Sequence, residues 1–412
     1  MLRRAFASFF IPAGTSPDAG PLLWARGLRA FGDGFVSLLL PFYLTLLGFD
    51  ALEIGVMITA TLLGSGLMTL AVGLIAHRCR GRSLLLAASL LMAATGIAIV
   101  FVNDFLPLLI VAFVGTLNPS TGDVSVFSPL EHSLLAQAAN VRSRTALFAR
   151  YSLVGALVGA AGAQAAGIPA FAAAFLALDI KTALQGMFLF YGALGCITVP
   201  FYRRLSPRID LHEAAQRPVP LGKSKKIVYT LAVLFSVDSF AGGFAVQSLL
   251  ALWLFDRFQL SVGTAGTIFF WVGVLSALSQ LASAKIAARF GLINTMVFTH
   301  IPSSLFLILV PFMPTLPLAL AFLFMRSALS QMDVPARASY VMAVVSPGER
   351  SAAAGVTAVP RSLAASVSPA IAGYLLSLSA FGWPLVICGG LKIVYDLLLL
   401  KMFSRVRPPE EI

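Results

Sequence analysis

The sequence has 412 residues, of which 58% are hydrophobic and only 11% are charged, and its mean hydropathy is +0.91. A soluble chain carries about 25% charged residues, so this composition excludes a soluble globular protein and predicts an integral membrane protein surrounded by a lipid bilayer. The net charge of +12 falls in short breaks between apolar stretches rather than on one basic face, which argues against a nucleic-acid partner. Cys79, Cys196 and Cys388 are far apart without ligand spacing, so neither a metal nor a cofactor is expected.

The apolar stretches predict the fold class: an all-α membrane protein with twelve transmembrane helices. Each stretch has about 20 mostly apolar residues, enough for a helix to cross a hydrocarbon core of about 30 Å. In the first half of the chain the predicted spans are 22–48, 53–76, 83–102, 105–127, 145–166 and 184–202. In the second half they are 227–254, 262–286, 292–313, 316–336, 351–378 and 381–401.

A basic, proline-containing stretch at 203–226 divides the spans into two groups of six. The expected domains are a lead-in (1–21), an N-terminal bundle (22–202), a linker (203–226), a C-terminal bundle (227–401) and a tail (402–412). Almost all loop Lys and Arg residues lie on the side of the termini and the linker, and only Lys181 and Arg257 lie in loops on the other side. This asymmetry predicts cytoplasmic termini, in a bacterial inner membrane.

The two halves repeat the same polar landmarks in the same order. Asp33 in the first span corresponds to Asp238 in the seventh, and Arg150 in the fifth corresponds to Arg361 in the eleventh. Two similar six-helix bundles can enclose a binding cavity near the bilayer midplane and rock about it. The repeat therefore predicts two pseudo-symmetric bundles that transport by alternating access.

Short motifs carry a resemblance to a known family. The loop after the second span reads Gly73-Leu-Ile-Ala-His77-Arg78, followed by Arg82, and the loop after the eighth ends in Arg289-Phe-Gly291. Together with the sequence from Asp33 to Gly55, these motifs resemble those of the major facilitator superfamily, and most closely those of its proton-coupled drug-antiporter branch.

The resemblance implies that these loop residues gate the cytoplasmic side. The sequence departs from the family pattern at His77, where the family has Asp, and in the fifth span, where Gly155 to Gly162 lacks the antiporter proline.

Charged residues inside predicted spans are candidates for function, because burying an ionised group in hydrocarbon costs at least ~2.5–3.5 kcal/mol. Arg29 and Asp33 are four residues apart on one helical face and could pair, which makes Asp33 a candidate proton carrier or one half of a static ion pair. Asp238, followed by Gly242-Gly243, either lines the cavity or is a buried, hydrogen-bonded acid.

Three further sets of charged residues have alternative interpretations. Arg150 and Arg361 either gate the cytoplasmic side by holding carboxylates such as Glu131 or Asp333, or bind an anionic substrate. Arg326 either binds an anion or pairs with Asp333. Around the same cytoplasmic loop, a structural ion network is expected from Asp333, Arg337, Glu349 and Arg350. Lys392 and Asp396, four residues apart, are expected to neutralise each other in a peripheral helix, and His300 is expected to be an interior hydrogen-bonded residue.

The function predicted from these features is secondary transport, as proton-coupled efflux of a small organic or amphipathic solute by a monomer. The alternatives are a proton symporter importing a small anionic metabolite and, more remotely, a non-transporting membrane receptor. An enzyme is not expected, since the sequence has no HExxH, GxSxG or phosphate-binding loop.

Overall fold

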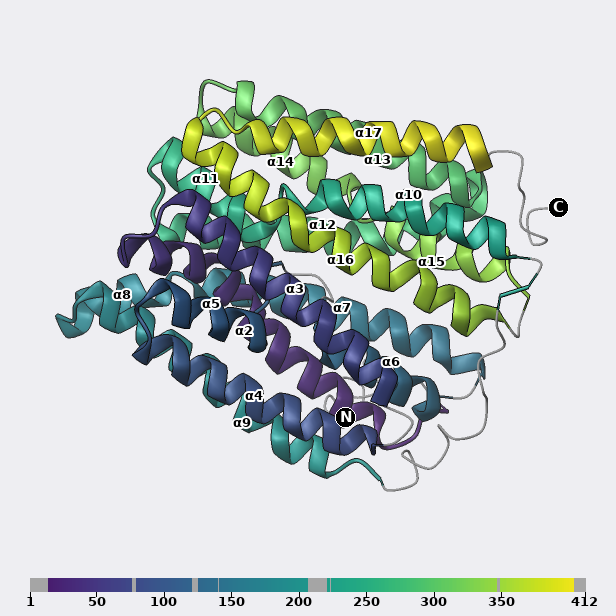
Figure 1. Cartoon of the computed structure of the whole chain (residues 1–412), viewed down its shortest axis with the longest axis horizontal. Coiled ribbons are helices and arrows are strands. Elements are labelled where there is room, and N and C mark those ends of the chain that lie inside the picture. Colours follow the sequence, from purple (N-terminus) through teal and green to yellow (C-terminus); the bar gives the residue numbers. More distant parts are fainter. Residues whose placement is uncertain are drawn as a thin grey trace, which may run out of the picture.

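The computed structural model describes residues 14–75, 79–120, 125–139, 141–206, 221–222, 224–346 and 349–403. Within these ranges the secondary structure is helical apart from one isolated bridge between Thr15 and Ala139. A lipid bilayer offers no partners to backbone N–H and C=O groups, so a helix, which satisfies them internally, is the expected solution. The predicted all-α fold is confirmed, and the long helices run roughly along one direction (Figure 1).

The helices of the first half extend from α2 to α9. Their bounds are α2 Ala19–Leu46, α3 Ala51–Ile75, α4 Gly81–Phe101, α5 Phe105–Val114, α6 Phe127–Ala138, α7 Val141–Ala165, α8 Ile168–Leu176 and α9 Ile180–Arg203. The second half extends from α10 to α17. Its bounds are α10 Lys225–Gly243, α11 Gln247–Phe258, α12 Val262–Phe290, α13 Leu292–Leu309 with a 3-10 turn at Val310–Phe312, α14 Leu316–Leu329, α15 Asp333–Ala343, α16 Arg350–Leu378 and α17 Trp383–Phe403.

Three predicted spans are each built from two helices. The predicted fourth span, 105–127, ends as a helix at Val114 and continues as α6, because Gly115 and Pro119 fall in the break and proline disfavours helix at the residue before it. The seventh span breaks after Gly243 and the tenth after Leu329. In the described part of the chain, seven helical stretches are long and apolar enough to cross a membrane, so the count of twelve is visible only in part.

Two helix pairs form the most extensive contacts between the halves, and α2 also contacts α11. Helix α3 packs along α16, and α7 packs along α12, while α2 packs on α7 and α9 within its own half and α10 packs on α16 and α17 within the other (Figure 1). We call the end of the molecule with Ala19, Arg203, Lys225 and Phe403 the terminal end, and the opposite end the distal end.

The helix pair α3–α16 is in close contact at its distal end. A Cβ on Gly55 would lie 2.5 Å from the carbonyl oxygen of Pro369, and one on Gly373 would lie 2.4 Å from that of Ala51, so only glycine fits at either position. At the terminal end of the same pair, a Cβ on Gly73 or Gly355 would meet no atom of the described residues within 4 Å. The two halves therefore touch distally and are spaced further apart toward the terminal end.

Neutral groups form hydrogen bonds across the interface. Gln164 Nε2 donates to Thr267 Oγ1 at 3.1 Å, and the backbone N–H of Ala370 donates to Thr59 Oγ1 at 2.9 Å. Ser248 Oγ donates to the carbonyl oxygen of Ser37 at 2.6 Å. Each of these contacts can be exchanged for water or another polar group without separating charges, which suits an interface that opens and closes.

Candidate functional site

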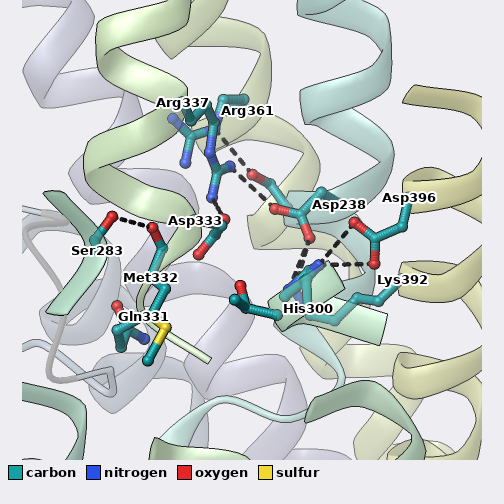
Figure 2. A network of polar contacts seen from close by, with 12 residues as sticks. Asp238, Ser283, His300, Gln331, Met332, Asp333, Arg337, Arg361, Lys392 and Asp396 are labelled. Atoms are coloured by element: carbon teal, nitrogen blue, oxygen red, sulfur yellow. Dashed lines mark hydrogen bonds and ion pairs between the residues drawn. The ribbon is translucent and has the colours of Figure 1, made fainter. Parts of the chain in front are cut away.

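A buried acid lies at the centre of the second half. Asp238, in the middle of α10, is 4% exposed and accepts hydrogen bonds on both carboxylate oxygens. Arg337 Nη1 of α15 donates to Oδ2 at 3.0 Å, and Lys392 Nζ of α17 donates to Oδ1 at 2.6 Å (Figure 2). Of the two alternatives for Asp238, a buried hydrogen-bonded acid describes its geometry, and its partners come from two other helices.

Two more contacts extend this group toward the interface helix α16. Arg337 also forms an ion pair with Asp333, one turn earlier in α15. Arg361 of α16 is partly buried beside them, and its Nε donates to Ser239 Oγ at 3.2 Å (Figure 2). Arg361 thus lies next to the acid-containing cluster on the helix that contacts the other half.

On the opposite side of Asp238 lies His300 of α13. Its Nδ1 is 3.0 Å from Asp396 Oδ2, and its Nε2 is 3.4 Å from Lys392 Nζ and 3.9 Å from Asp238 Oδ1. Figure 2 shows the imidazole ring between Asp396 on one side and Asp238 and Lys392 on the other. The imidazole therefore connects α10, α13 and α17 in one polar group.

We call this group the charge network: Asp238, His300, Asp333, Arg337, Arg361, Lys392 and Asp396. The network contains three carboxylates and three cations, so its net charge is zero when the imidazole is neutral. Buried charges are tolerated when they are paired and hydrogen-bonded, and removing one partner leaves an uncompensated charge. The network can therefore change its charge by one unit through a single protonation.

The first half contains a second buried cluster, built around Glu131 of α6, which is 0% exposed. Arg29 of α2 forms an ion pair with it, and the hydroxyls of Tyr151 and Tyr202 donate hydrogen bonds to it. The Arg29 guanidinium also lies over the ring of Phe127, 4.1 Å from its centroid. A guanidinium and two phenol hydroxyls thus hold a single carboxylate; we call Arg29, Glu131, Tyr151 and Tyr202 the Glu131 cluster.

Asp33 lies one turn from Arg29 on α2 and is buried. Asn118, in the break between α5 and α6, donates to its Oδ2 at 3.4 Å. The ion pair identified for Arg29 is with Glu131, a partner that the sequence analysis had considered only for Arg150 and Arg361. The helix break explains this, because it brings α6 next to α2, and no spacing along the chain predicts that contact.

The two clusters use equivalent helices with opposite polarity. In the first half, the cation Arg29 on α2 pairs with the acid Glu131 on the second part of a broken span. In the second half, the acid Asp238 on α10 pairs with the cation Arg337, again on the second part of a broken span. Each half thus has a buried ion pair between the same two elements with the signs exchanged, although the residue that corresponds to Asp238 in the repeat is Asp33 and not Arg29.

Several predicted pairings are different in the structure. Lys392 and Asp396 do not neutralise each other: Lys392 binds Asp238, and Asp396 binds His300. Asp333 pairs with Arg337 of its own helix, which agrees with the structural ion network and not with a pairing to Arg361. Arg150 is partly buried, and its Nη1 has no hydrogen-bond partner among the described residues. An i,i+4 spacing places two side chains on one face of a helix but does not say which neighbour each will meet.

The predicted gating residues lie near the terminal end. Gly73 is exposed in the last turns of α3, Arg82 is partly buried in the first turn of α4, and Arg289 is exposed at the end of α12. Gly291 has φ of +83° between α12 and α13, a conformation that favours glycine. Arg326 lies partly buried on α14. The predicted residues His77 and Arg78 lie outside the described residues, as do most of the 203–226 linker and the terminal segments.

Near the terminal end, Glu349 links the start of α16 to the segment before α10. The N–H of Gly222 donates to its carboxylate, as do the hydroxyls of Ser346 and Ser224, and these bonds lower the pKa of Glu349 to about 2. Among the described residues, no group of three or more His, Cys, Asp or Glu could hold a metal ion.

Two members of these clusters differ from the prediction, since Lys392 was expected to be peripheral and Glu131 to be a gate partner. His300 is an interior hydrogen-bonded residue, as predicted, but its partners were not identified from the sequence. The signal that could have found them is their position, since a lone polar residue inside an apolar span needs a partner on another helix. Tyr151 and Tyr202 gave no such signal, because tyrosine is common in membrane helices.

The family model described as Major Facilitator Superfamily matches residues 231–412, a stretch that contains the whole charge network. Over 426 residues the chain is 26% identical to an uncharacterized membrane protein of Saccharomyces cerevisiae, covering 93% of this chain and 94% of that protein.

Solved transporter structures share the fold. A point mutant of the nucleoside transporter NupG superimposes with a TM-score of 0.74 at 15% identity, covering 94% of this chain and all of that one. The human organic anion transporter MFSD10 superimposes with a TM-score of 0.62 at 17% identity, and the match covers 93% of this chain and 100% of that one. A bacterial homologue of the human lysosomal transporter Spinster, in an inward-facing and occupied conformation, superimposes with a TM-score of 0.71 at 14% identity. The match covers 94% of this chain and 97% of that one.

Proposed function

Because the chain has the fold of the Major Facilitator Superfamily, and that family's sequence signature over residues 231–412, we propose that it is a secondary active transporter coupling a small organic solute to protons. The family model and the transporter neighbours support transport rather than enzymatic catalysis. The proposed unit is a monomer in the lipid bilayer, since one chain supplies both halves of the fold.

The charge network is the observation that supports the proposed proton coupling. It places three acids and a histidine, all less than a tenth exposed, on four helices of one half, next to the helix α16 that contacts the other half. Buried ionisable groups in membrane proteins are costly and are found in ion and proton pathways. Asp238 is proposed as the central coupling residue, and Asp33 with Arg29 as the corresponding group of the first half.

Alternating access is supported by the contact pattern of the two halves. The pair α3–α16 touches at Gly55 and Gly373 and is open at Gly73 and Gly355. If both termini are cytoplasmic, as the Lys and Arg distribution predicts, the open end faces the cytoplasm. Rocking would then break the glycine contacts distally and bring Gly73, Arg82 and Arg289 toward the other half.

Efflux is the proposed direction, and it rests on the likeness of the first span to the drug-antiporter branch. Two of the neighbours named above are transporters of nucleosides and of organic anions, which supports a small-molecule substrate for this fold. The solute itself is to be identified by screening solutes in a transport assay. A second candidate, proton symport of a small anion, is favoured by Arg361, a cation on the interface helix whose Nε bonds a hydroxyl rather than a carboxylate.

The test uses inside-out vesicles loaded with a pH-sensitive dye, energised to an acid interior, and challenged with cationic, neutral and anionic solutes. Antiport predicts that one solute class releases protons with the wild type and not with Asp238→Asn or Asp33→Asn. Asp256→Asn, which removes an exposed acid of α11, is the matched control and should behave as wild type. Anion symport predicts instead proton-driven uptake into cells that Arg361→Gln abolishes. No proton movement with any solute would refute both forms of the proposal.

A further inference from the structure

We propose that His300 is the group that binds the coupling proton in the second half, and that its protonation displaces Lys392 from the imidazole ring. The inference rests on the proposed proton coupling and names the residue and nitrogen that carry it out. It comes from the donors and acceptors around the ring, which leave only one neutral form of His300 consistent with its neighbours.

The ring nitrogens have different partners. Lys392 carries an ammonium group, which has three donors and no acceptor, and its Nζ lies 3.4 Å from His300 Nε2. Nε2 must therefore accept, with its lone pair directed at Lys392. Nδ1 lies 3.0 Å from Asp396 Oδ2, and a carboxylate accepts, so Nδ1 carries the hydrogen. The geometry assigns a neutral imidazole with its proton on Nδ1.

A proton added to Nε2 changes both contacts of that nitrogen. Nε2–H and the ammonium are both donors and both positive, so their 3.4 Å contact becomes repulsive. Asp238 Oδ1, which now accepts from Lys392, lies 3.9 Å from Nε2 and becomes the acceptor for the new N–H. One proton is taken up, Lys392 stays an ammonium and loses two acceptors, and the network changes from neutral to a single positive charge.

The groups around His300 favour this response. From α17 it faces Lys392, Tyr395 and Asp396, and from α10 it faces Asp238, which connects it to Asp333 and Arg337 of α15. Helix α14 contacts α13 through Arg326, whose carbonyl oxygen accepts from Ser303 Oγ. The charged residues of α12 near α13, Lys285 and Arg289, are exposed at its end. Two carboxylates within 4 Å of the ring can stabilise an imidazolium, and the cation in contact with the ring is Lys392.

Lys392 also controls access to the ring. Its side chain is 14% exposed, while those of His300 and Asp238 are 5% and 6% exposed. A lysine side chain has several rotatable bonds, so its ammonium can move away from the ring when repelled. That movement breaks the hydrogen bond from Lys392 to Asp238 Oδ1 and exposes Nε2. Protonation is thereby coupled to the contacts between α10 and α17. Since α10 also packs on α16, the change reaches the helix that contacts the other half.

The first measurement is 15N NMR of the imidazoles in the full-length protein, reconstituted in lipid. The signals of His300 are identified as those that disappear from the spectrum of His300→Gln. The assignment is checked with His77→Gln, His132→Gln and His212→Gln, each of which should lose a different set of signals. We expect a neutral His300 with its proton on Nδ1 that becomes an imidazolium on acidification. An Nε2–H tautomer, or a ring that stays in one state over the whole range, would overturn the assignment.

The second measurement is the dye assay with His300→Gln, which keeps a hydrogen-bonding side chain but binds no proton. We expect solute-driven proton release to be lost while exchange of labelled for unlabelled solute across the membrane continues. Proton release that is unchanged in His300→Gln would refute the role of His300 and leave the proposed function standing. Absence of proton release in the wild type would refute the proposed coupling itself, and with it any coupling role for His300, whatever its NMR spectrum shows.

Discussion

Replacing Asp238 by Asn removes one negative charge from the centre of the charge network and keeps the shape of the side chain. Arg337 at 3.0 Å and Lys392 at 2.6 Å then lose this counter-ion, and Arg337 keeps only its ion pair with Asp333. Two unit charges about 3 Å apart attract by roughly 5–6 kcal/mol at an effective dielectric constant of about 20. Because desolvation offsets part of this, the measured cost of removing one buried partner is about 3–5 kcal/mol.

The assay is thermal unfolding in detergent, with the double variant Asp238→Asn/Lys392→Met as the informative control. For a unit the size of one half, about 3 kcal/mol lowers the melting temperature by roughly 6 °C or more. The double variant restores neutrality and should recover a large part of the loss, giving an interaction energy above about 1 kcal/mol. Two results would contradict the prediction: equal melting temperatures for Asp238→Asn and Asp256→Asn, or a stability loss in the double variant equal to the sum of the losses in the two single variants. In either case the charge balance of the network does not stabilise this fold.

Three further predictions concern other parts of the molecule. Glu131→Gln leaves Arg29 without its counter-charge and should cost about 3–5 kcal/mol in the same unfolding assay, whereas wild-type stability would show that the Glu131 cluster is not held by charge. Gly55→Leu places side-chain atoms on the carbonyl of Pro369, so spin-label distances between the distal ends of α3 and α16 should lengthen; an unchanged distance distribution would contradict the contact. The pKa of Glu349 is lowered from 4.5 to about 2, so its stabilising contribution is present above pH 4.5 and is lost as pH falls toward 2, and the stability difference between wild type and Glu349→Gln should shrink over that window.

Much of the fold was predictable because hydrocarbon imposes simple rules on sequence. Apolar stretches of sufficient length predicted the helices, and the proline at 119 and the glycines at 242 and 243 mark two of the places where spans break. The all-α fold and the resemblance to the superfamily were predicted correctly. The extent of the fourth span was not, since α6 is too polar to be recognised as part of a membrane crossing.

The partners of the buried charges were less predictable. Asp33 and Asp238 were singled out correctly as buried acids, because an acid in an apolar span is conspicuous. Lys392 was assigned to Asp396 on spacing alone, and the structure turns these two residues toward α10 and α13 instead. Which helices become neighbours depends on long-range packing, so a single sequence predicts that a buried ion needs a partner without identifying it.

The placement of ion pairs has a consequence for how the protein is made. Arg29 and Glu131 are both synthesised before residue 203, and Asp238, Arg337 and Lys392 are all synthesised after residue 225. Each half therefore leaves the ribosome with the counter-ions that its own buried charges require. The first half can enter the membrane and fold while the second is still being translated. We expect that the two halves, produced as separate polypeptides in one cell, will each insert and will then associate through their glycine contacts and neutral hydrogen bonds.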